Sequence, residues 1–156
     1  MDFFFHPKWV HFPIALLITA GGIYLWTLLA KDKSWLRAAF LIHILGWIGC
    51  VASVLTGRQA ENLIVHTPAI QDLLSLHERL GYLITWLFAM LGIWMFLRLK
   101  KIAKWELILF SVLFWAGNGT MAYMGHLGGE MVYQEGAGVA PMKEIHQEHY
   151  QHDTKE

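Results

Sequence analysis

The sequence predicts an all-α fold, an integral membrane bundle of four helices, from three observations. Of the 156 residues, 56% are hydrophobic and only 15% are charged, whereas soluble domains carry about a quarter charged residues. The apolar residues collect in four runs, each long enough to cross ~30 Å of hydrocarbon as a helix. Two of the three connections between the runs are short and rich in lysine. The predicted spans are residues 12–30, 35–56, 78–99 and 105–125.

The first span follows Lys8, which raises the alternative of a cleavable signal peptide. However, the run is longer than the roughly 7–15 apolar residues of a signal peptide. The charged residues Lys31, Asp32 and Lys33 follow it, in place of a small-residue cleavage site. We therefore expect the first span to be retained.

The orientation follows from the unequal charge of the connections. Residues 31–34 and 100–104, with Arg37 and Arg98 nearby, hold most of the cations, and the charges of the remaining segments are mixed. Cytoplasmic connections of membrane proteins carry the excess of Lys and Arg. We therefore expect these two connections in the cytoplasm and both termini outside.

The chain is expected to form one domain. Residues 1–140 contain the four spans, and residues 141–156 form a polar tail, which is either a solvated end or a place of metal capture. The histidines of the tail are His146, His149 and His152. The single cysteine, Cys50, excludes an internal disulfide and covalent attachment of a c-type haem. The net charge of zero argues against nucleic acid as a partner.

Two segments outside the predicted spans carry further signals. Residues 61–76 contain apolar positions typical of short amphipathic helices on the outer surface, interrupted at Pro68. After the fourth span the chain is rich in glycine, which predicts a loop. This loop either covers the outer edge of a cofactor or is an irregular return of the chain. The glycines are Gly128, Gly129, Gly136 and Gly138.

The two halves of the chain resemble each other weakly, which indicates two pseudo-symmetric helical hairpins. The pattern His-x-x-x-small-x-Leu-Ile-Thr begins at His11 and again at His77. The second and fourth spans also match, with tryptophan and glycine at corresponding positions. This repeat places His11 opposite His77 near the outer surface, and His126 lies at a similar depth.

Small side chains lie one and two turns below the first two histidines, on the same helix face. They are Ala15 and Thr19 below His11, and Gly81 and Thr85 below His77. Small residues are also common at ordinary helix contacts in membranes. Ionisable residues within spans usually serve a function, however. The pattern therefore favours slots between helices, each with a histidine above it.

The expected cofactor is a noncovalent b-type haem. A haem iron accepts two neutral imidazoles as axial ligands, and His11 and His77 suit this role. Arg58 or His126 would hold the propionates as charged hydrogen-bond donors. Iron with two histidine ligands has no open position for a substrate, so the expected work is electron transfer. The electrons would pass from quinol in the membrane to an outer acceptor, or within a larger redox complex.

Two alternatives stay open. In the first, His11, His77 and His126 bind zinc or copper, with Met121 and Met124 adding thioethers that favour Cu(I). In the second, the chain is a scaffold subunit without a cofactor. No nucleotide fingerprint, catalytic triad or acidic dyad is present in a suitable context, so we do not expect a stand-alone enzyme.

His43 stands apart from the other histidines, because it lies about two turns into the second span from its cytoplasmic end. A lone histidine at this depth is expected to form a hydrogen bond with a backbone carbonyl. The alternative is a second haem, held by His43 and Met90.

Several motifs resemble a family of small bacterial four-span membrane proteins of unknown function. They are His6-Pro7, the His-Phe-Pro-Ile stretch 11–14, His77 and the Gly-His-Leu-Gly-Gly-Glu-Met-Val-Tyr stretch 125–133. The resemblance covers residue 6 to about 140. It implies four spans in the bacterial cytoplasmic membrane. Members are often found beside or fused to c-type cytochromes, which implies redox work but assigns no ligand.

Overall fold

The computed structural model describes residues 5–62, 64 and 66–138. These residues form four long helices and contain no strand, which confirms the predicted all-α four-helix fold. Each helix is long and apolar enough to cross a membrane. The helices are α1 (Phe5–Ala30), α2 (Leu36–Glu61), α3 (Pro68–Arg98) and α4 (Lys104–Tyr133).

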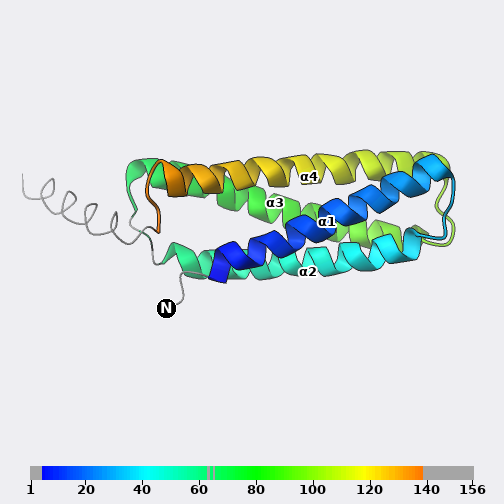
Figure 1. Ribbon diagram of the computed structural model, residues 1–156, viewed down its shortest axis with the longest axis horizontal. Helices are drawn as coiled ribbons and strands as arrows, with labels where there is room; N and C mark the ends of the chain where they lie inside the picture. Colours follow the sequence, from blue (N-terminus) through cyan, green and yellow to red (C-terminus); the bar gives the residue numbers. More distant parts are fainter. Residues whose placement is uncertain (1–4, 63, 65, 139–156) are drawn as a thin grey trace, which may run out of the picture.

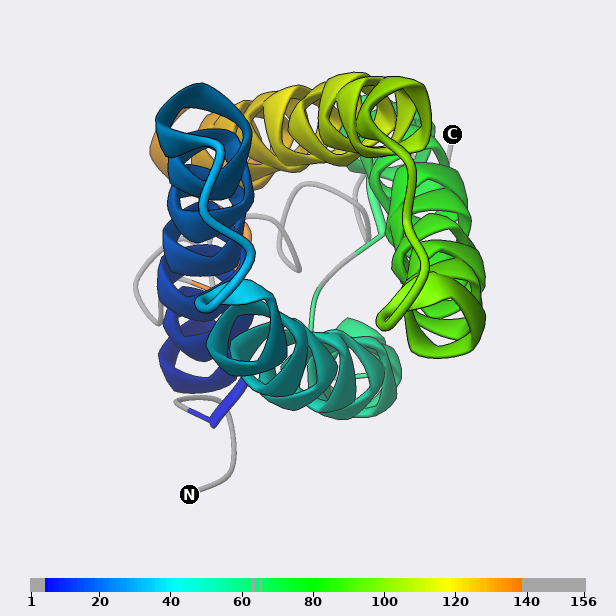
Figure 2. The same cartoon turned by 90° about the vertical axis from the view of Figure 1, so that its right-hand side faces the viewer.

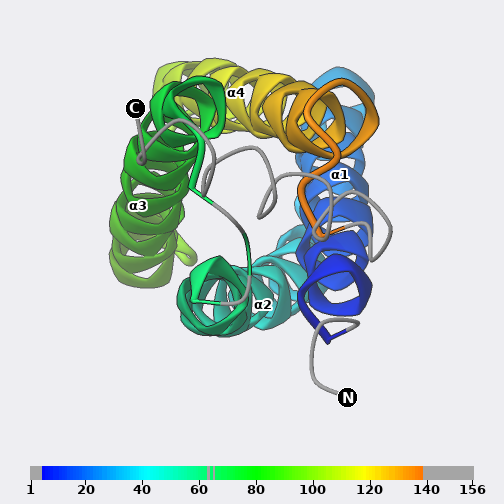
Figure 3. The same ribbon diagram turned by 90° about the vertical axis from the view of Figure 1, so that its left-hand side faces the viewer.

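The helices stand at the corners of a square, in the order α1, α2, α3, α4 (Figures 2 and 3). Helix α1 packs against α2 and α4, so that α1 and α3 face each other across a diagonal. Helices α1 and α3 begin, and α2 and α4 end, at one end of the bundle, which we call the histidine end (Figure 1). The opposite end, with connections 31–35 and 99–103, is the lysine end.

Aromatic side chains fill the middle of the bundle. Tyr24, Phe88, Phe110 and Phe114 are fully buried. The ring of Tyr24 lies edge-on to Phe110 and Phe114, with centroids 4.7 and 5.2 Å apart. Phe88 and Phe114 make a similar contact at 5.0 Å. Edge-to-face packing of this kind is favourable beyond the buried area alone, so this cluster joins α1, α3 and α4.

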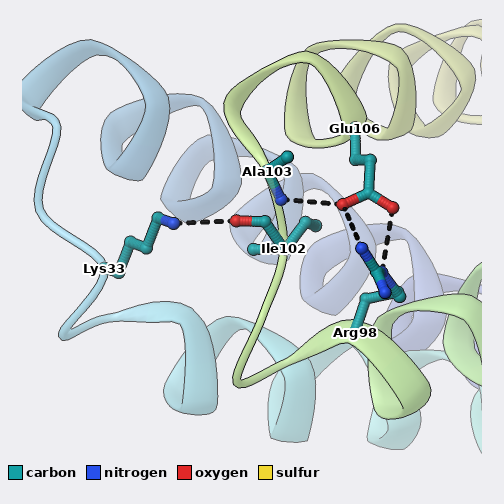
Figure 4. Close-up of polar contacts among 5 residues, drawn as sticks. All are labelled: Lys33, Arg98, Ile102, Ala103 and Glu106. Carbon is teal, nitrogen blue, oxygen red and sulfur yellow. Dashed lines mark hydrogen bonds and ion pairs between the residues drawn. The ribbon is translucent and has the colours of Figure 1, made fainter.

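Polar contacts join the two connections at the lysine end (Figure 4). The Lys33 ammonium donates to the carbonyl oxygen of Ile102 at 2.7 Å. The buried Glu106 carboxylate forms a two-pronged ion pair with Arg98, at 2.9 Å for each contact. It also accepts from the backbone N–H of Ala103 at 2.7 Å. Glu106 therefore caps the start of α4, where a negative charge is favoured, and ties it to the end of α3.

Helix α3 begins earlier than predicted, at Pro68, and continues without a break through residue 76. The expectation of short helical pieces interrupted at Pro68 is therefore wrong. Proline is well suited to the first position of a helix, because its fixed φ fits and no N–H is needed there. Thr67 caps the same turn, since its hydroxyl accepts from the backbone N–H of Ile70 at 3.2 Å.

Helix α4 continues to Tyr133, eight residues beyond the predicted end of the span. Gly128 and Gly129 are therefore helical, and the expectation of a loop from this point is wrong for them. The chain turns only at Gly136 and Gly138, whose φ angles of 65° and 78° lie in the left-handed region that glycine adopts easily. These residues fold over the histidine end (Figure 3).

Helix α1 crosses α2 at very short distance because α2 has glycine at the contact positions. A Cβ atom on Gly46 would lie 2.8 Å from Cγ of Leu17, and one on Gly49 would lie 3.1 Å from Pro13. The α1 helix runs obliquely, from beside α4 near the lysine end toward α2 at the histidine end (Figures 1 and 3). Glycines that allow close approach are a common device of membrane helix packing.

We predict that Gly46→Ala destabilises the bundle by about 1–3 kcal/mol, because the added methyl group overlaps buried Leu17. The measurement is unfolding by sodium dodecyl sulfate in mixed micelles, followed by circular dichroism. The control is Gly22→Ala, since no described atom lies within 4 Å of a Cβ at Gly22. Equal effects of the two substitutions would contradict the proposed role of the close contact.

Candidate functional site

His6 lies in the first turns of α1 and points at α2. Its ring lies on Gly57, where an added Cβ would be 3.1 Å from Cε1 of the imidazole. Nδ1 of His6 is 3.2 Å from the hydroxyl of Thr56, and the backbone carbonyl of Ser53 also accepts a hydrogen bond from the ring. The ring is therefore held by one turn near the end of α2.

The partners of His6 determine which nitrogen carries the proton. The single hydrogen of the Thr56 hydroxyl is directed at the carbonyls of Ala52 and Ser53, at 2.9 and 3.1 Å. The Thr56 oxygen therefore accepts a hydrogen bond from Nδ1–H of His6. The backbone carbonyl of Ser53 is a second acceptor for the same ring. Burial lowers the pKa of His6 more than this hydrogen bond raises it. The imidazole is thus neutral near pH 7, with a lone pair on Nε2.

His77 lies on α3 and points at α4 in the same way. Its Nδ1 is 3.1 Å from the backbone oxygen of Met124, and its ring lies on Gly128, with a built Cβ 3.4 Å from Cε1. A carbonyl oxygen can only accept, so Nδ1 of His77 carries the hydrogen and Nε2 again carries a lone pair. Ring orientation by a backbone carbonyl is typical of histidines that ligate metals.

The two histidines form matching halves of one site. Each lies on the first helix of a hairpin, donates to a carbonyl of the second helix, and rests on a glycine one turn later. The second member of each pair follows the first by 71 residues: His6 and His77, Ser53 and Met124, Gly57 and Gly128. Both rings lie at the histidine end, His6 against α2 and His77 against α4. We call His6 and His77, from diagonally opposed helices, the histidine pair.

The structure does not bring His11 toward His77. The side chains of His11, Ala15 and Thr19 are exposed, and Thr19 donates to the carbonyl of Ala15 at 2.7 Å within its own helix. This face of α1 therefore points out of the bundle. His126 is exposed as well, with its ring 6.5 Å from that of Tyr123.

The small residues below His77 lie at helix contacts inside the bundle. A Cβ on Gly81 would meet the sulfur of Met124 at 3.7 Å. Thr85 donates to the carbonyl of Gly81 at 2.8 Å, and its own carbonyl accepts from the indole of Trp47 at 3.2 Å. Arg58 is exposed at the histidine end and interacts electrostatically with Glu78.

His6 was not among the predicted iron ligands. The apolar runs define the predicted spans, and Lys8 separates His6 from the first of these runs. His11 follows His6 by five positions, so the two side chains point about 140° apart around the helix axis. Only one of them can face the interior, and the contact of α1 with α2 decides which one. The shared 71-residue spacing of His6–Gly57 and His77–Gly128 is the sequence signal that could have found it.

His43 is fully buried in the aromatic cluster. Its Nε2 donates to the carbonyl of Phe88 at 3.0 Å, and its Nδ1 lies 3.5 Å from the hydroxyl of Tyr24. The expected hydrogen bond to a backbone carbonyl is therefore confirmed. Met90 is 52% exposed and lies on the outer face of α3. The geometry therefore does not support a second haem between His43 and Met90.

The described residues contain no group of three or more His, Cys, Asp or Glu side chains arranged to hold a metal ion. His6 and His77 each direct Nδ1 at the protein, so each ring keeps a second nitrogen with a lone pair, which is the atom that ligates metals.

Together, four apolar helices and a histidine pair at one end define a multi-pass membrane protein with a candidate ligand site in its bundle. The chain belongs to a family of predicted membrane proteins, DUF2231, whose model matches residues 3–141. This confirms the resemblance that the sequence motifs indicated. No curated protein and no solved structure matches the chain.

We predict that His43→Leu lowers the free energy of unfolding by about 1–3 kcal/mol, because a buried donor to α3 is lost. Unfolding in mixed micelles measures this change, with exposed His126→Leu as the control that leaves stability unchanged. Any pigment of the wild-type protein should survive His43→Leu. A variant that folds normally but loses pigment would show that His43 is a ligand.

Proposed function

We propose that the protein is a membrane electron-transfer component that binds a b-type haem noncovalently between His6 and His77. The single observation behind the proposal is the histidine pair. Two imidazoles on diagonally opposed helices each have Nδ1 hydrogen-bonded to protein, which leaves the lone pair on Nε2. Haem iron in bundle cores is held in this way by side chains of facing helices.

The surroundings of the pair are compatible with a flat macrocycle. Gly57 and Gly128 lie beneath the two rings, so that no side chain at these positions fills the space beside the imidazoles. Arg58 lies one residue after Gly57, and its exposed guanidinium would pair with a propionate. The bound group would supply one-electron chemistry. The protein's own residues would bind and orient it and limit the access of water.

A zinc or three-histidine copper centre is less well supported. Such a centre needs three or four protein ligands. His11 and His126 are both exposed, whereas His77 is half-buried against α4. Among the described histidines of this end, His6 and His77 pack on neighbouring helices, and haem iron accepts two such imidazoles.

We place the protein in the bacterial cytoplasmic membrane with the histidine end outside. The family resemblance and the charge distribution support this placement, since Lys and Arg are enriched in cytoplasmic connections. The cations of the lysine end are Lys31, Lys33, Arg37, Arg98, Lys100, Lys101 and Lys104. With this orientation, electrons would reach an acceptor outside the cell membrane, such as a c-type cytochrome or another subunit of a redox complex.

The test is a reduced-minus-oxidised visible spectrum of the purified protein, with metal analysis on the same sample. We expect a sharp α band, stoichiometric iron, and loss of both in His6→Ala and in His77→Ala, because each would remove one of the two residues that hold the haem.

The matched controls are His11→Ala and His126→Ala, which remove exposed imidazoles and should keep the pigment. Full pigment in both His6→Ala and His77→Ala would refute the ligand assignment. A colourless wild-type protein with copper or zinc would favour the metal-ion alternative, and a colourless, metal-free protein would favour a scaffold role.

A further inference from the structure

The contact between His6 and the Thr56 hydroxyl has no counterpart in the other hairpin. The spacing of 71 residues that relates the two halves matches Thr56 with Leu127. Leu127 is buried, and its apolar side chain cannot accept a hydrogen bond. The acceptor for His77 is instead the backbone carbonyl of Met124, at 3.1 Å. The two imidazoles of the histidine pair therefore differ in the groups that hold them.

The Thr56 hydroxyl is oriented by its own helix. It donates to the backbone carbonyls of Ala52 and Ser53, at 2.9 and 3.1 Å. A hydroxyl has one hydrogen and two lone pairs, so these bonds leave a lone pair for Nδ1–H of His6, at 3.2 Å. Threonine is also restricted about χ1 because it is branched at Cβ. The acceptor is therefore held in a fixed position beside the imidazole.

Gly57, the next residue, lets the imidazole come within hydrogen-bond distance of this hydroxyl. A Cβ on Gly57 would lie 3.1 Å from Cε1 of His6 and 3.5 Å from Nδ1. A side chain at this position would push the ring away from α2 and weaken the contact with Thr56. Two successive residues of α2 therefore act together, because Gly57 leaves room for the ring and Thr56 supplies an acceptor.

We propose that Thr56 is a positioning residue for His6. Its hydroxyl oxygen holds the imidazole with the hydrogen on Nδ1, so that the lone pair stays on Nε2, the nitrogen that would bind the haem iron. Such an acceptor also makes the ligating nitrogen more basic, as the hydrogen-bond partners of metal-ligating histidines do. This inference deepens the proposed function and rests on it only for the identity of the group that Nε2 binds.

The first readout is the Nδ1–H proton of His6, observed by NMR in the reduced full-length protein with ¹⁵N-labelled histidine. Reduced haem iron with two histidine ligands is diamagnetic, so the measurement applies with or without haem. The signal is assigned by its loss in His6→Ala. We expect Thr56→Val, which keeps the side-chain shape, to exchange this proton with water roughly two- to tenfold faster, because one neutral hydrogen bond is lost.

Two further variants serve as controls. Thr56→Ser keeps the hydroxyl and should exchange the proton as the wild type does. Ser53→Ala removes a neighbouring hydroxyl, which donates to the carbonyl of Gly49 at 2.9 Å within α2. It leaves the Ser53 backbone carbonyl in place, so the His6 signal should not change. Circular dichroism should show that all three variants fold.

The second readout is the midpoint potential of the protein with haem. We expect Thr56→Val to shift it to a more positive value, because a less basic imidazole stabilises ferric iron less. Thr56→Ser should keep the wild-type potential, since its hydroxyl still accepts from His6. A purely structural role of Thr56 would change the stability of the bundle without this shift in potential.

The outcomes keep the two proposals apart. The positioning role is overturned if His6 carries its hydrogen on Nε2, if Thr56→Val leaves the exchange rate unchanged, or if Ser53→Ala has an equal effect. A protein without haem whose His6 signal responds to Thr56→Val would refute the proposed function and support the positioning role. A protein with haem on His6 and His77 that does not respond to Thr56→Val would do the reverse.

Discussion

The close contact of α1 with α2 determines most of the architecture. Gly46, Gly49 and Gly57 line one side of α2 and let α1 approach more closely than Cβ atoms at these positions would easily allow. Because α1 follows this glycine seam, it leans toward α2 at the histidine end and away from α4. The same seam places the ring of His6 over Gly57. One packing constraint therefore sets both the tilt of α1 and the position of a candidate ligand.

The histidine pair also shows how a membrane bundle places polar groups without water. Each imidazole satisfies one nitrogen with protein groups, the carbonyl of Ser53 and the hydroxyl of Thr56 for His6, and the carbonyl of Met124 for His77. Unsatisfied polar groups are costly in hydrocarbon, so these bonds fix both the ring orientation and the tautomer. The lone pair on Nε2 of each ring then has a fixed direction, because these hydrogen bonds hold the ring in place.

The sequence predicted the fold well and the candidate site only in part. Four apolar runs were sufficient for four helices, because hydrocarbon thickness imposes a minimum length on each. The helix ends were harder to predict. A proline such as Pro68 can end a helix or begin one, and the cap from Thr67 shows that this one begins α3. His77 was recognised from its place at a span. His6 and His11 differ only in helix register against α2, and apolar runs do not encode that register.

The aromatic cluster around His43 separates the two ends of the bundle, which carry different polar groups. Tyr24, Phe88, Phe110 and Phe114 interlock across the middle of the bundle, and His43 lies among these rings, with its Nε2 donating to the carbonyl of Phe88 and its Nδ1 3.5 Å from the Tyr24 hydroxyl. This layer lies between the lysine end, with its Arg98–Glu106 ion pair, and the histidine end. The polar contacts of the two ends are therefore formed far apart, and we expect the effects of substitutions at the two ends to be additive.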